Sequence, residues 1–476
     1  MIDTGKQPNT LLAGVMKQAG ATNKGLARRV RLLSEQDGGE PVRCDHVSVK
    51  RWLDGTTRQP HPRTCQLIAR VLGEMLGRTV TLAEIGYAET AGEDDNDGGD
   101  IGLDYPEEVA QTVATLGAIT DLELRTPKKA EPLTVVPQAW SDLVVRWLTD
   151  SDSDRSRPPA EPRRITFVDV EAVREATAMF SSFDYKYGGG RPKMLVASFL
   201  DQEVLPNIPH VSPHDPIGRE YFREVAALTR LAGWTAYDTG AHGLAQRYLT
   251  QAFRLAKAAG DKPLCGRILA GMSHQANFLG HYQRAVDLAR AASKGANGYA
   301  TPTTMALFSA MEARALASLG REEEATAALL TAERWHGQGN RENDPEWIRY
   351  FDRAELHAEF AHCFRDLGNA ELANHHAAAS IRESESTYVR SLSFVRTVLA
   401  TSHLQDGNLD EALYVARSVV KTAASLKSLR VVSYLDEFRS RLGAFSNDPL
   451  VRDFLDFATL HLPSKGAPVS RTLLVA

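Results

Sequence analysis

A short segment near the N-terminus of this 476-residue chain carries the residues whose types and spacing best fit a chemical task. Residues 45–55 (DHVSVKRWLDG) begin with a helix-capping acid, end with a glycine, and place Val49, Trp52 and Leu53 at helical spacing. The polar residues of the segment fall on the opposite face, namely His46, Ser48, Lys50 and Arg51. A helix with one apolar face for the core and one cationic face is what an element entering the major groove of DNA needs.

Charge is distributed unevenly around that segment. The whole chain has a formal net charge of −5, yet residues 23–80 hold eleven basic and six acidic residues, a net charge of +5. Residues 89–108 then hold nine acids and no base. This order predicts a folded cationic module, residues 9–88, followed by a flexible acidic linker, residues 89–104. A solvated basic face beside an ordinary loop is the alternative.

Two more helices are expected beside this segment. Asn23 would cap the first, which continues through Arg28. The second is residues 64–72 (TCQLIARVL), an amphipathic pattern that ends at Gly73. Residues 34–44 (SEQDGGEPVRC), which precede the central segment, have the composition of a loop.

The string VSVKRWLDG at residues 47–55, followed by Pro60 and by IARVLG at residues 68–73, resembles the helix-turn-helix of Xre/Cro-type repressors. This resemblance implies that the recognition helix carries His46, Ser48, Lys50 and Arg51, and that phosphate is met just after it by Arg58 and Arg63. To the expected DNA-binding residues we add two from the preceding helix, Asn23 and Arg28. One spacing departs from that family: Ala27 and Val49 are about twelve positions further apart, so an expanded turn is expected between the first two helices.

The C-terminal half of the chain repeats one pattern five times. Gly-x-x-x-x-Ala recurs at glycine intervals of 40, 40, 48 and 39 residues, at Gly240, Gly280, Gly320, Gly368 and Gly407. Seven positions before each glycine stands a small residue: Gly233, Ser273, Ala313, Ala361 and Ala400. Four positions after each alanine stands an apolar residue: Leu249, Ala289, Leu329, Ala377 and Ala416. Small residues let two antiparallel helices approach closely and the glycine permits a left-handed backbone between them, so each unit is expected to be a helical hairpin.

These positions resemble those of tetratricopeptide repeats (TPR) over about residues 225–425. The intervals exceed the usual unit of about 34 residues, so longer helices or longer loops are expected. The last two repeats carry Ser380 and Val419 where the second alanine belongs. The resemblance implies a solenoid over residues 218–462 with a concave groove, and an ordinary alanine-rich helical domain is the alternative. The expected fold class is therefore mainly α, with an N-terminal helix-turn-helix domain and a C-terminal TPR-like α-solenoid.

The groove of such repeats is where a ligand is expected, because the family places the first helix of each repeat on the concave side. By family position that side would carry Arg230, Trp234, Tyr237, Asp238, His274, Asn277, Arg314, His362 and Arg365. The expected ligand-binding residues among them are Arg230, Trp234, Tyr237, His274, Asn277 and Arg314. Aromatic, arginine, asparagine and histidine side chains suit the backbone and carboxylate of an extended peptide, or a planar metabolite. Bridging between helices is the alternative role.

A middle helical region is predicted at residues 105–217. Residues 140–148 and 170–180 have helical patterns, whereas residues 150–162 (DSDSDRSRPPAEP) form a charged insertion rich in serine and proline. The glycines at 188–190 mark a turn. They lack the spacing of a phosphate-binding loop, which favours a hinge.

Patterns typical of catalysis or metal binding are missing from the sequence. Four widely separated cysteines favour reduced thiols in the cytoplasm: Cys44, Cys65, Cys265 and Cys363. The histidines at 357, 362, 375 and 376 do not have the spacing of metal ligands on one helix face. Without a Ser-His-Asp order, a reactive-cysteine signature or paired carboxylates, we expect no enzyme and no cofactor. Neither a signal peptide nor a membrane span is visible.

An Xre-like head joined to alanine-rich repeats resembles a family of actinomycete transcriptional regulators, which includes negative regulators of sporulation and antibiotic production. The resemblance implies a cytoplasmic, nucleoid-associated regulator of double-stranded DNA, with repression favoured over activation. In related firmicute proteins a signalling peptide held in the repeats changes the pose of the DNA-binding heads, so a peptide or small-molecule signal is expected. One weakly charged head would bind poorly alone, which predicts a homodimer, formed through the repeats, on a two-fold operator. The alternative is a protein-interaction adaptor whose head is not a specific DNA reader.

Overall fold

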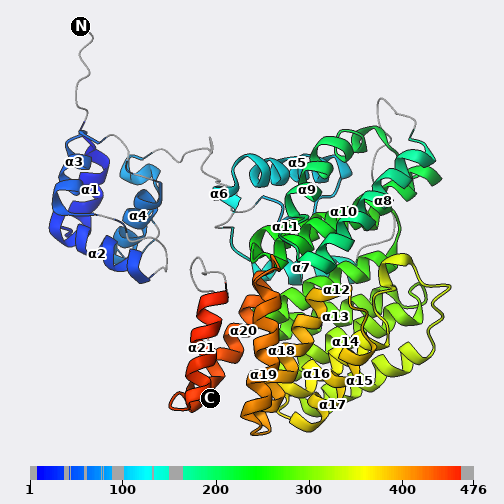
Figure 1. Ribbon diagram of the computed structural model, residues 1–476. Helices are drawn as coiled ribbons and strands as arrows, with labels where there is room; N and C mark the ends of the chain where they lie inside the picture. The colour runs from blue at the N-terminus through cyan, green and yellow to red at the C-terminus, as the bar shows by residue number, and fades with distance from the viewer. Residues whose placement is uncertain are drawn as a thin grey trace. The chain divides into compact units, whose positions relative to one another are not determined.

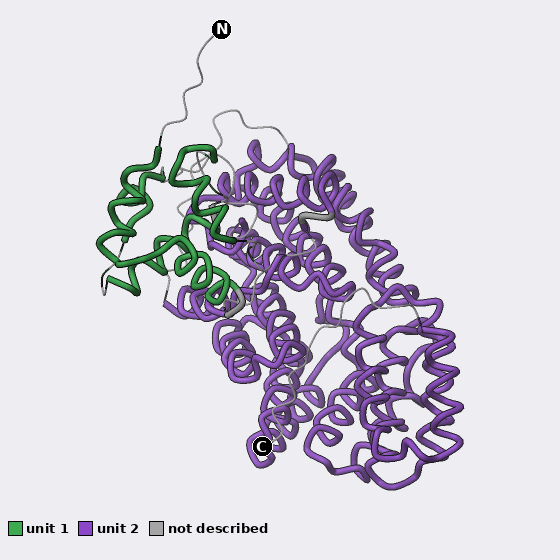
Figure 2. The backbone as a smooth tube through the Cα atoms, turned by 90° about the vertical axis from the view of Figure 1, so that its left-hand side faces the viewer, with its two compact units in different colours: residues 1–97 green, residues 98–476 purple. Residues whose placement is uncertain are grey.

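The computed structural model describes residues 8–36, 42, 44–57, 60, 62–76, 78, 80–87, 101–130, 133–149 and 165–462. These residues form a mainly α protein and include no strand (Figure 1). They belong to two compact units, residues 1–97 and 98–476, which Figure 2 distinguishes by colour. Within the described ranges, no helix is long and apolar enough to cross a membrane.

The N-terminal unit, called the head below, packs four helices and one short turn around an apolar core, as far as its residues are described. Its elements are α1 (Thr10–Gln18), α2 (Asn23–Gln36), α3 (His46–Leu53), α4 (Pro62–Leu76) and the 3-10 turn η1 (Ala83–Ile85). Val49 and Trp52 of α3 share the core with Leu26 of α2 and with Ile68 and Leu72 of α4. The three helices expected from the sequence are therefore present and share one core.

Helix α1 was not expected, and a single asparagine connects it to the rest of the head. The side-chain Oδ1 of Asn9 accepts a hydrogen bond from the Leu12 amide at 2.9 Å and so caps α1. Its Nδ2 donates to the carbonyl of Ile85 at 2.9 Å, and its amide donates to the carbonyl of Leu53 at 3.0 Å. The start of α1, the end of α3 and the turn η1 therefore meet at one residue.

Three expected helix boundaries in the head are wrong. The cap of α2 is Thr22, whose hydroxyl accepts from the Gly25 amide at 3.1 Å, so Asn23 is already the first helical residue. Helix α2 continues through Ser34, which is buried and accepts from the Val42 amide at 2.8 Å. Part of the expected loop at 34–44 is therefore helix, while residues 37–41 and 43 lie outside the described residues. Helix α4 runs past Gly73, where a Cβ would lie 2.8 Å from the carbonyl oxygen of Arg78, so this glycine allows a close approach and does not end the helix.

The C-terminal unit is built from the remaining helices. Before the repeats it contains α5 (Val109–Arg125), α6 (Pro127–Ala130), α7 (Pro137–Thr149), α8 (Phe167–Tyr187), α9 (Lys193–Phe199), the π-helical turn η2 (Leu200–Val204) and the 3-10 turn η3 (Ile208–His210). The repeats are α10 (Pro216–Asp238), α11 (His242–Ala258), α12 (Lys262–Phe278), α13 (Tyr282–Ala296), α14 (Pro302–Ser318), α15 (Glu322–Gly337), η4 (Glu346–Ile348), α16 (Arg353–Asp366), α17 (Ala370–Glu383), α18 (Val389–Gln405) and α19 (Leu409–Ala423). After them come α20 (Leu429–Arg441), η5 (Leu442–Phe445) and α21 (Pro449–His461).

The five expected helical hairpins are confirmed. Helices α10 to α19 pack in consecutive pairs, and the turn glycine of each pair has a φ between 71° and 84°. The small residue of each first helix and the alanine and apolar residue of each second helix are all buried. A Cβ on Gly233, for example, would lie 2.9 Å from Cγ of Leu249 in the facing helix. Residues of these sizes at these positions therefore set the close packing of each pair.

The region that precedes the repeats shares their core. Trp140, Trp147 and Val170 belong to the same apolar cluster as the residues of α10 to α14. The indole nitrogen of Trp147 donates to the carbonyl of Ala291 in α13 at 2.9 Å. The helical patterns expected at 140–148 and 170–180 lie within α7 and α8. Residues 98–476 consequently form one compact unit.

The chain of the C-terminal unit returns to its first hairpin. The Lys427 amide donates to the carbonyl of Tyr187, and the Gly190 amide donates to the carbonyl of Lys427, both at 2.9 Å. Gly188 has a φ of 82°, and a Cβ there would lie 2.9 Å from the carbonyl oxygen of Lys427. The glycines at 188–190 thus form the turn expected after α8, and they leave room for the segment that leads into α20.

Candidate functional site

The first candidate site is the exposed face of α3 in the head. Asp45 caps the helix, because its Oδ1 accepts from the Ser48 amide at 2.7 Å and from the Ser48 hydroxyl at 2.8 Å. These two hydrogen bonds lower the pKa of Asp45. Val49 and Trp52 are buried, so the opposite face is turned outward: His46, Lys50 and Arg51 are exposed and Ser48 is half-buried.

The basic residues of this face are free of acidic partners within the described part of the head. The ion pairs there are Arg70 with Glu74 and Arg78 with Glu84, and neither involves α2 or α3. Arg28 on α2 is exposed, whereas Asn23 is half-buried at the start of that helix. The remaining expected DNA-binding residues, Arg58 and the side chain of Arg63, lie outside the described residues. An exposed cation without a carboxylate partner can exchange its water for a phosphate or a base edge.

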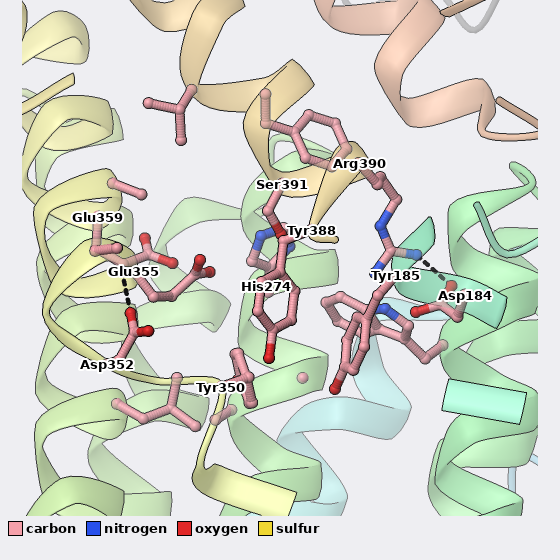
Figure 3. A pocket seen from close by; sticks show the side chains of 18 of the residues that line it. Asp184, Tyr185, His274, Tyr350, Asp352, Glu355, Glu359, Tyr388, Arg390 and Ser391 are labelled. Atoms are coloured by element: carbon pink, nitrogen blue, oxygen red, sulfur yellow. Dashed lines mark hydrogen bonds and ion pairs between the residues drawn. The ribbon is translucent and has the colours of Figure 1, made fainter. Parts of the chain in front are cut away.

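The second candidate site is a cavity in the C-terminal unit, shown in Figure 3. Its lining comes from the first helix of all five hairpins, from α8 and α20, and from the loops before α16 and α18. Among the described residues, the second helices of the hairpins contribute nothing to it. Its volume is about 1280 Å³, the open mouth included. The first helices of the five hairpins therefore line one common cavity.

Four of the six expected ligand-binding residues line this cavity, namely Arg230, Trp234, His274 and Arg314. The other two, Tyr237 and Asn277, do not. Both lie one turn further along their helices and are buried, and the Tyr237 hydroxyl meets Nδ1 of His274 at 2.9 Å. Of the further groove positions His362 lines the cavity, whereas Asp238 and Arg365 pack elsewhere.

Several lining residues were missed by the sequence analysis, although a regular signal was present. Arg267 and Glu355 stand seven residues before His274 and His362 in α12 and α16. Since seven residues are close to two helical turns, both belong to the face already chosen. Other missed residues belong to no repeated position, namely Asp184, Tyr185, Tyr350, Tyr388, Arg390, Arg430 and Tyr434.

Four charged residues near the cavity pair with one another, and we call them the clasp: Asp184, Asp238, Arg390 and Arg430. Arg390 pairs with Asp184 and lies 3.6 Å from Asp238, while Nε of Arg430 lies 2.9 Å from Oδ1 of Asp238. The Gly189 amide donates to Asp238 at 2.8 Å. Burial opposes the ionisation of Asp238, but the two guanidiniums and this amide overcome it and lower its pKa. The clasp joins α8 and α10 to α18 and α20.

A second buried pair lies on the opposite side of the lining. Nη1 of Arg314 lies 2.8 Å from Oε2 of Glu359, and both side chains are 7% exposed. Burial lowers the pKa of His274 and of His362 well below the ordinary value, so both imidazoles are neutral near pH 7. Figure 3 shows Asp352, Glu355 and Glu359 grouped together, apart from Asp184 and Arg390.

Five charged residues of the lining form no ion pair among the described residues: Arg230, Arg267, Asp352, Glu355 and Glu385. Of these, Asp352 caps α16 and Glu385 is exposed. Arg267 is only 7% exposed, and its Nε and Nη1 are buried without a hydrogen-bond partner. Burial and the neighbouring Arg267 guanidinium lower the pKa of Arg230 to about 9. Burial, together with the nearby Glu359 and Asp352, raises the pKa of Glu355 to about 8. The cavity therefore holds two arginines without an ion-pair partner and, in Glu355, a carboxyl group that keeps its proton near neutral pH.

Other reactive groups do not assemble into a site. Within the described ranges, no group of three or more histidine, cysteine, aspartate or glutamate residues is placed to hold a metal ion. His357 and His376 do meet, with their Nδ1 atoms 2.9 Å apart, but across two helices and without a third such ligand. The four cysteines are free and buried.

A family model matches the N-terminal part of the chain. Residues 12–88 match a family described as the SP15 N-terminal domain. The matched segment begins in α1 and extends just past η1, so it coincides with the folded part of the head. No curated protein matches the chain.

Proposed function

We propose that the chain is a sequence-specific DNA-binding transcriptional regulator, in which the head binds DNA and the C-terminal unit binds a signal. The observation that carries the proposal is the structure of α3. Its Val49 and Trp52 are buried while Lys50 and Arg51, on the opposite face, are exposed and without acidic partners among the described residues. A short, capped helix of this kind can present its side chains to base edges in the major groove.

The arrangement around α3 supports a helix-turn-helix. Helix α2 packs against both α3 and α4, and Ala27 of α2 and Val49 of α3 belong to one core. In this proposal α3 is the recognition helix, and Arg28 on α2 contacts the DNA backbone. The match to the SP15 N-terminal domain covers the same helices and supports an independent role for the head.

The hairpins support a TPR-like array as the signal-binding part. Five glycines with positive φ join helices whose small residues pack closely, and the first helices enclose a common cavity. We propose a cytoplasmic, nucleoid-associated homodimer that represses developmental or secondary-metabolism genes. Two heads would then occupy the half-sites of a two-fold operator about one helical turn, roughly 34–36 Å, apart. Static light scattering that gives a monomer both alone and with DNA would contradict the dimer.

DNA binding can be tested by replacing the exposed basic residues of α3, Lys50 and Arg51. Genomic fragments are first selected by the full-length protein at low ionic strength, and affinities are then measured by fluorescence anisotropy. Lys50→Ala with Arg51→Ala should weaken specific binding by about 100-fold or more, because each specific contact contributes about 1–3 kcal/mol.

The matched control removes two other exposed positive charges of the head. Lys17→Ala with Arg70→Ala changes the net charge by the same amount, so it should reduce specific binding only slightly and reproduce the change in nonspecific binding. Equal losses in both double variants would show that α3 does not read sequence. A protein that binds no fragment would favour the adaptor hypothesis, in which the repeats hold a protein partner.

A further inference from the structure

The unpaired charges of the cavity differ in kind on its two sides. Arg230 and Arg267 come from α10 and α12, the first helices of adjacent hairpins. Glu355 comes from α16 and lies with Asp352 and Glu359. Of the two carboxylates beside Glu355, Glu359 pairs with Arg314 and Asp352 accepts the Glu355 amide at 3.0 Å.

The arginine side of the cavity is suited to an anion. The Arg267 guanidinium is close enough to lower the pKa of Arg230, so the two like charges repel, and neither has a carboxylate partner among the described residues. The Arg267 guanidinium lies over the rings of Trp347 and Tyr350, with its Cζ 4.8 and 5.2 Å from their centres. Its Nε and Nη1 remain without acceptors although the side chain is nine-tenths buried. An anionic group in the cavity beside the two guanidiniums would offset their positive charge and reduce the repulsion.

The glutamate side is suited to a cation. The Glu355 carboxylate faces the cavity without a hydrogen bond or ion pair among the described residues, and Glu359 and Asp352 add negative charge beside it. A protonated amine has three donors and a compact charge, so it can bridge such carboxylates. The space around both ends is lined by aromatic side chains, among them Trp234, Tyr388 and Phe394.

We propose that this cavity binds a small zwitterion, with its anionic group on Arg230 and Arg267, its protonated amine on Glu355, and an apolar or aromatic body between them. A monovalent anion would leave Glu355 unmatched, and an amine alone would leave both arginines unmatched. This proposal rests on the proposed function in one respect, because it gives a chemical class to the signal that the C-terminal unit would bind. It does not depend on whether the head binds DNA.

The first experiment measures ligand binding to the full-length protein without DNA. Three sets of probes are compared by thermal shift and isothermal titration calorimetry: the free α-amino acids, ω-amino acids of increasing length, and dipeptides with one aromatic residue. Each probe is also used with its amine acetylated or its carboxylate amidated. We expect at least one free zwitterion to raise the melting temperature, and each capped form of it to bind at least 10-fold more weakly.

Two results would overturn the proposal. One is the absence of stabilisation by every free zwitterion in the three sets at millimolar concentration. The other is an acetylated or amidated form that binds as tightly as its parent. Because no DNA is present, a negative result here leaves the DNA-binding proposal standing, and a head that ignores DNA leaves this one standing.

Substitutions in the cavity then test which residues contact the anionic group of the ligand and which contact its amine. Arg230→Gln should weaken binding of the free zwitterion at least 10-fold without lowering the melting temperature of the unliganded protein, because it removes a half-buried charge that repels Arg267 and has no ion-pair partner among the described residues. Glu355→Gln should weaken the binding of the free zwitterion but leave any residual binding of its acetylated form unchanged. Arg321→Gln, an exposed arginine outside the cavity, is the control and should change neither. A lower unliganded melting temperature for Arg230→Gln, with unchanged affinity, would assign Arg230 a purely structural role and contradict the proposal.

A cavity-filling variant gives an independent test. Gly271 lines the cavity in α12, and a Cβ there would meet nothing within 4 Å. Gly271→Met should therefore fold and block ligand binding. Gly117 in α5 has equally open surroundings outside the cavity, so Gly117→Met should bind normally. Equal affinity in both variants would contradict the cavity as the binding site.

Discussion

Among single residues, Glu355 has the clearest effect on stability, because its carboxyl group has no ion-pair partner among the described residues. Its pKa is raised from 4.5 to about 8, because burial and the neighbouring Glu359 and Asp352 oppose ionisation more than Arg314 and Arg390 favour it. Between pH 4.5 and pH 8 the folded state keeps a proton that the unfolded chain has lost. The free energy of unfolding therefore falls as the pH rises through this window.

Glu355→Gln should remove this dependence. We expect the variant to be more stable than the natural protein at pH 8, by roughly 2–4 kcal/mol, and to differ little at about pH 4.5. Urea denaturation at several pH values, without ligand, measures the difference. A gain of the same size at both ends of the window would show that the carboxylate is not strained by its charge.

The site residues that could be found from the sequence are those at repeated positions. Arg230, Trp234 and His274 lie on the first helices at places set by the turn glycines, and Arg267 could have been found by extending that face two turns. Arg430 could not be found in this way. It reaches the site only because the chain returns to its first hairpin, which no local pattern encodes.

At the scale of the elements, glycines act in two opposite ways. Gly280 follows the end of a helix at a φ of 84°, a conformation that costs other residues about 1–2 kcal/mol. Gly271 lies inside α12 at ordinary helical φ, where glycine is worse than alanine by about 0.5–1 kcal/mol. A Cβ at either position would meet no atom within 4 Å, so steric clashes do not mask the backbone effect.

Gly280→Ala should therefore lower the free energy of unfolding by about 1–2 kcal/mol, and Gly271→Ala should raise it by about 0.5–1 kcal/mol. Denaturation of the two variants in parallel compares the same chemical change at two backbone conformations. Changes of the same sign would contradict this account of the hairpin turn.

Elements marked by a repeated signal were predictable, and isolated elements were less so. Five occurrences of one pattern reinforce each other, which is why the hairpins of residues 216–423 followed from spacing alone. Helix α1 has a cap and three buried apolar residues but occurs once, and it was missed. The ends of α2 and α4 were misplaced because tertiary contacts at Ser34 and Gly73 override the local loop and glycine signals.

For the C-terminal unit as a whole, the clasp has the largest energetic role. Arg390 and Asp238 are almost fully buried, so removal of one partner leaves a charge without compensation. Arg390→Gln should lower the free energy of unfolding by about 3–5 kcal/mol. Arg441→Gln, which breaks an exposed pair with Glu437 within α20, should cost less than about 1 kcal/mol. Chemical denaturation measures both, and similar losses would show that the clasp is no stronger than a surface pair.

The contact of the segment after the repeats with the first hairpin changes where the repeats are expected to unfold first. In an open array the terminal units have one neighbour and fray first. Here the segment after the fifth hairpin is bonded to the turn after α8 through Lys427, and α20 to α10 through Asp238. The first and last hairpins are thus not free ends. Equivalent core substitutions should therefore destabilise every hairpin to a similar extent. In an open repeat array, by contrast, such substitutions matter less in the terminal repeats.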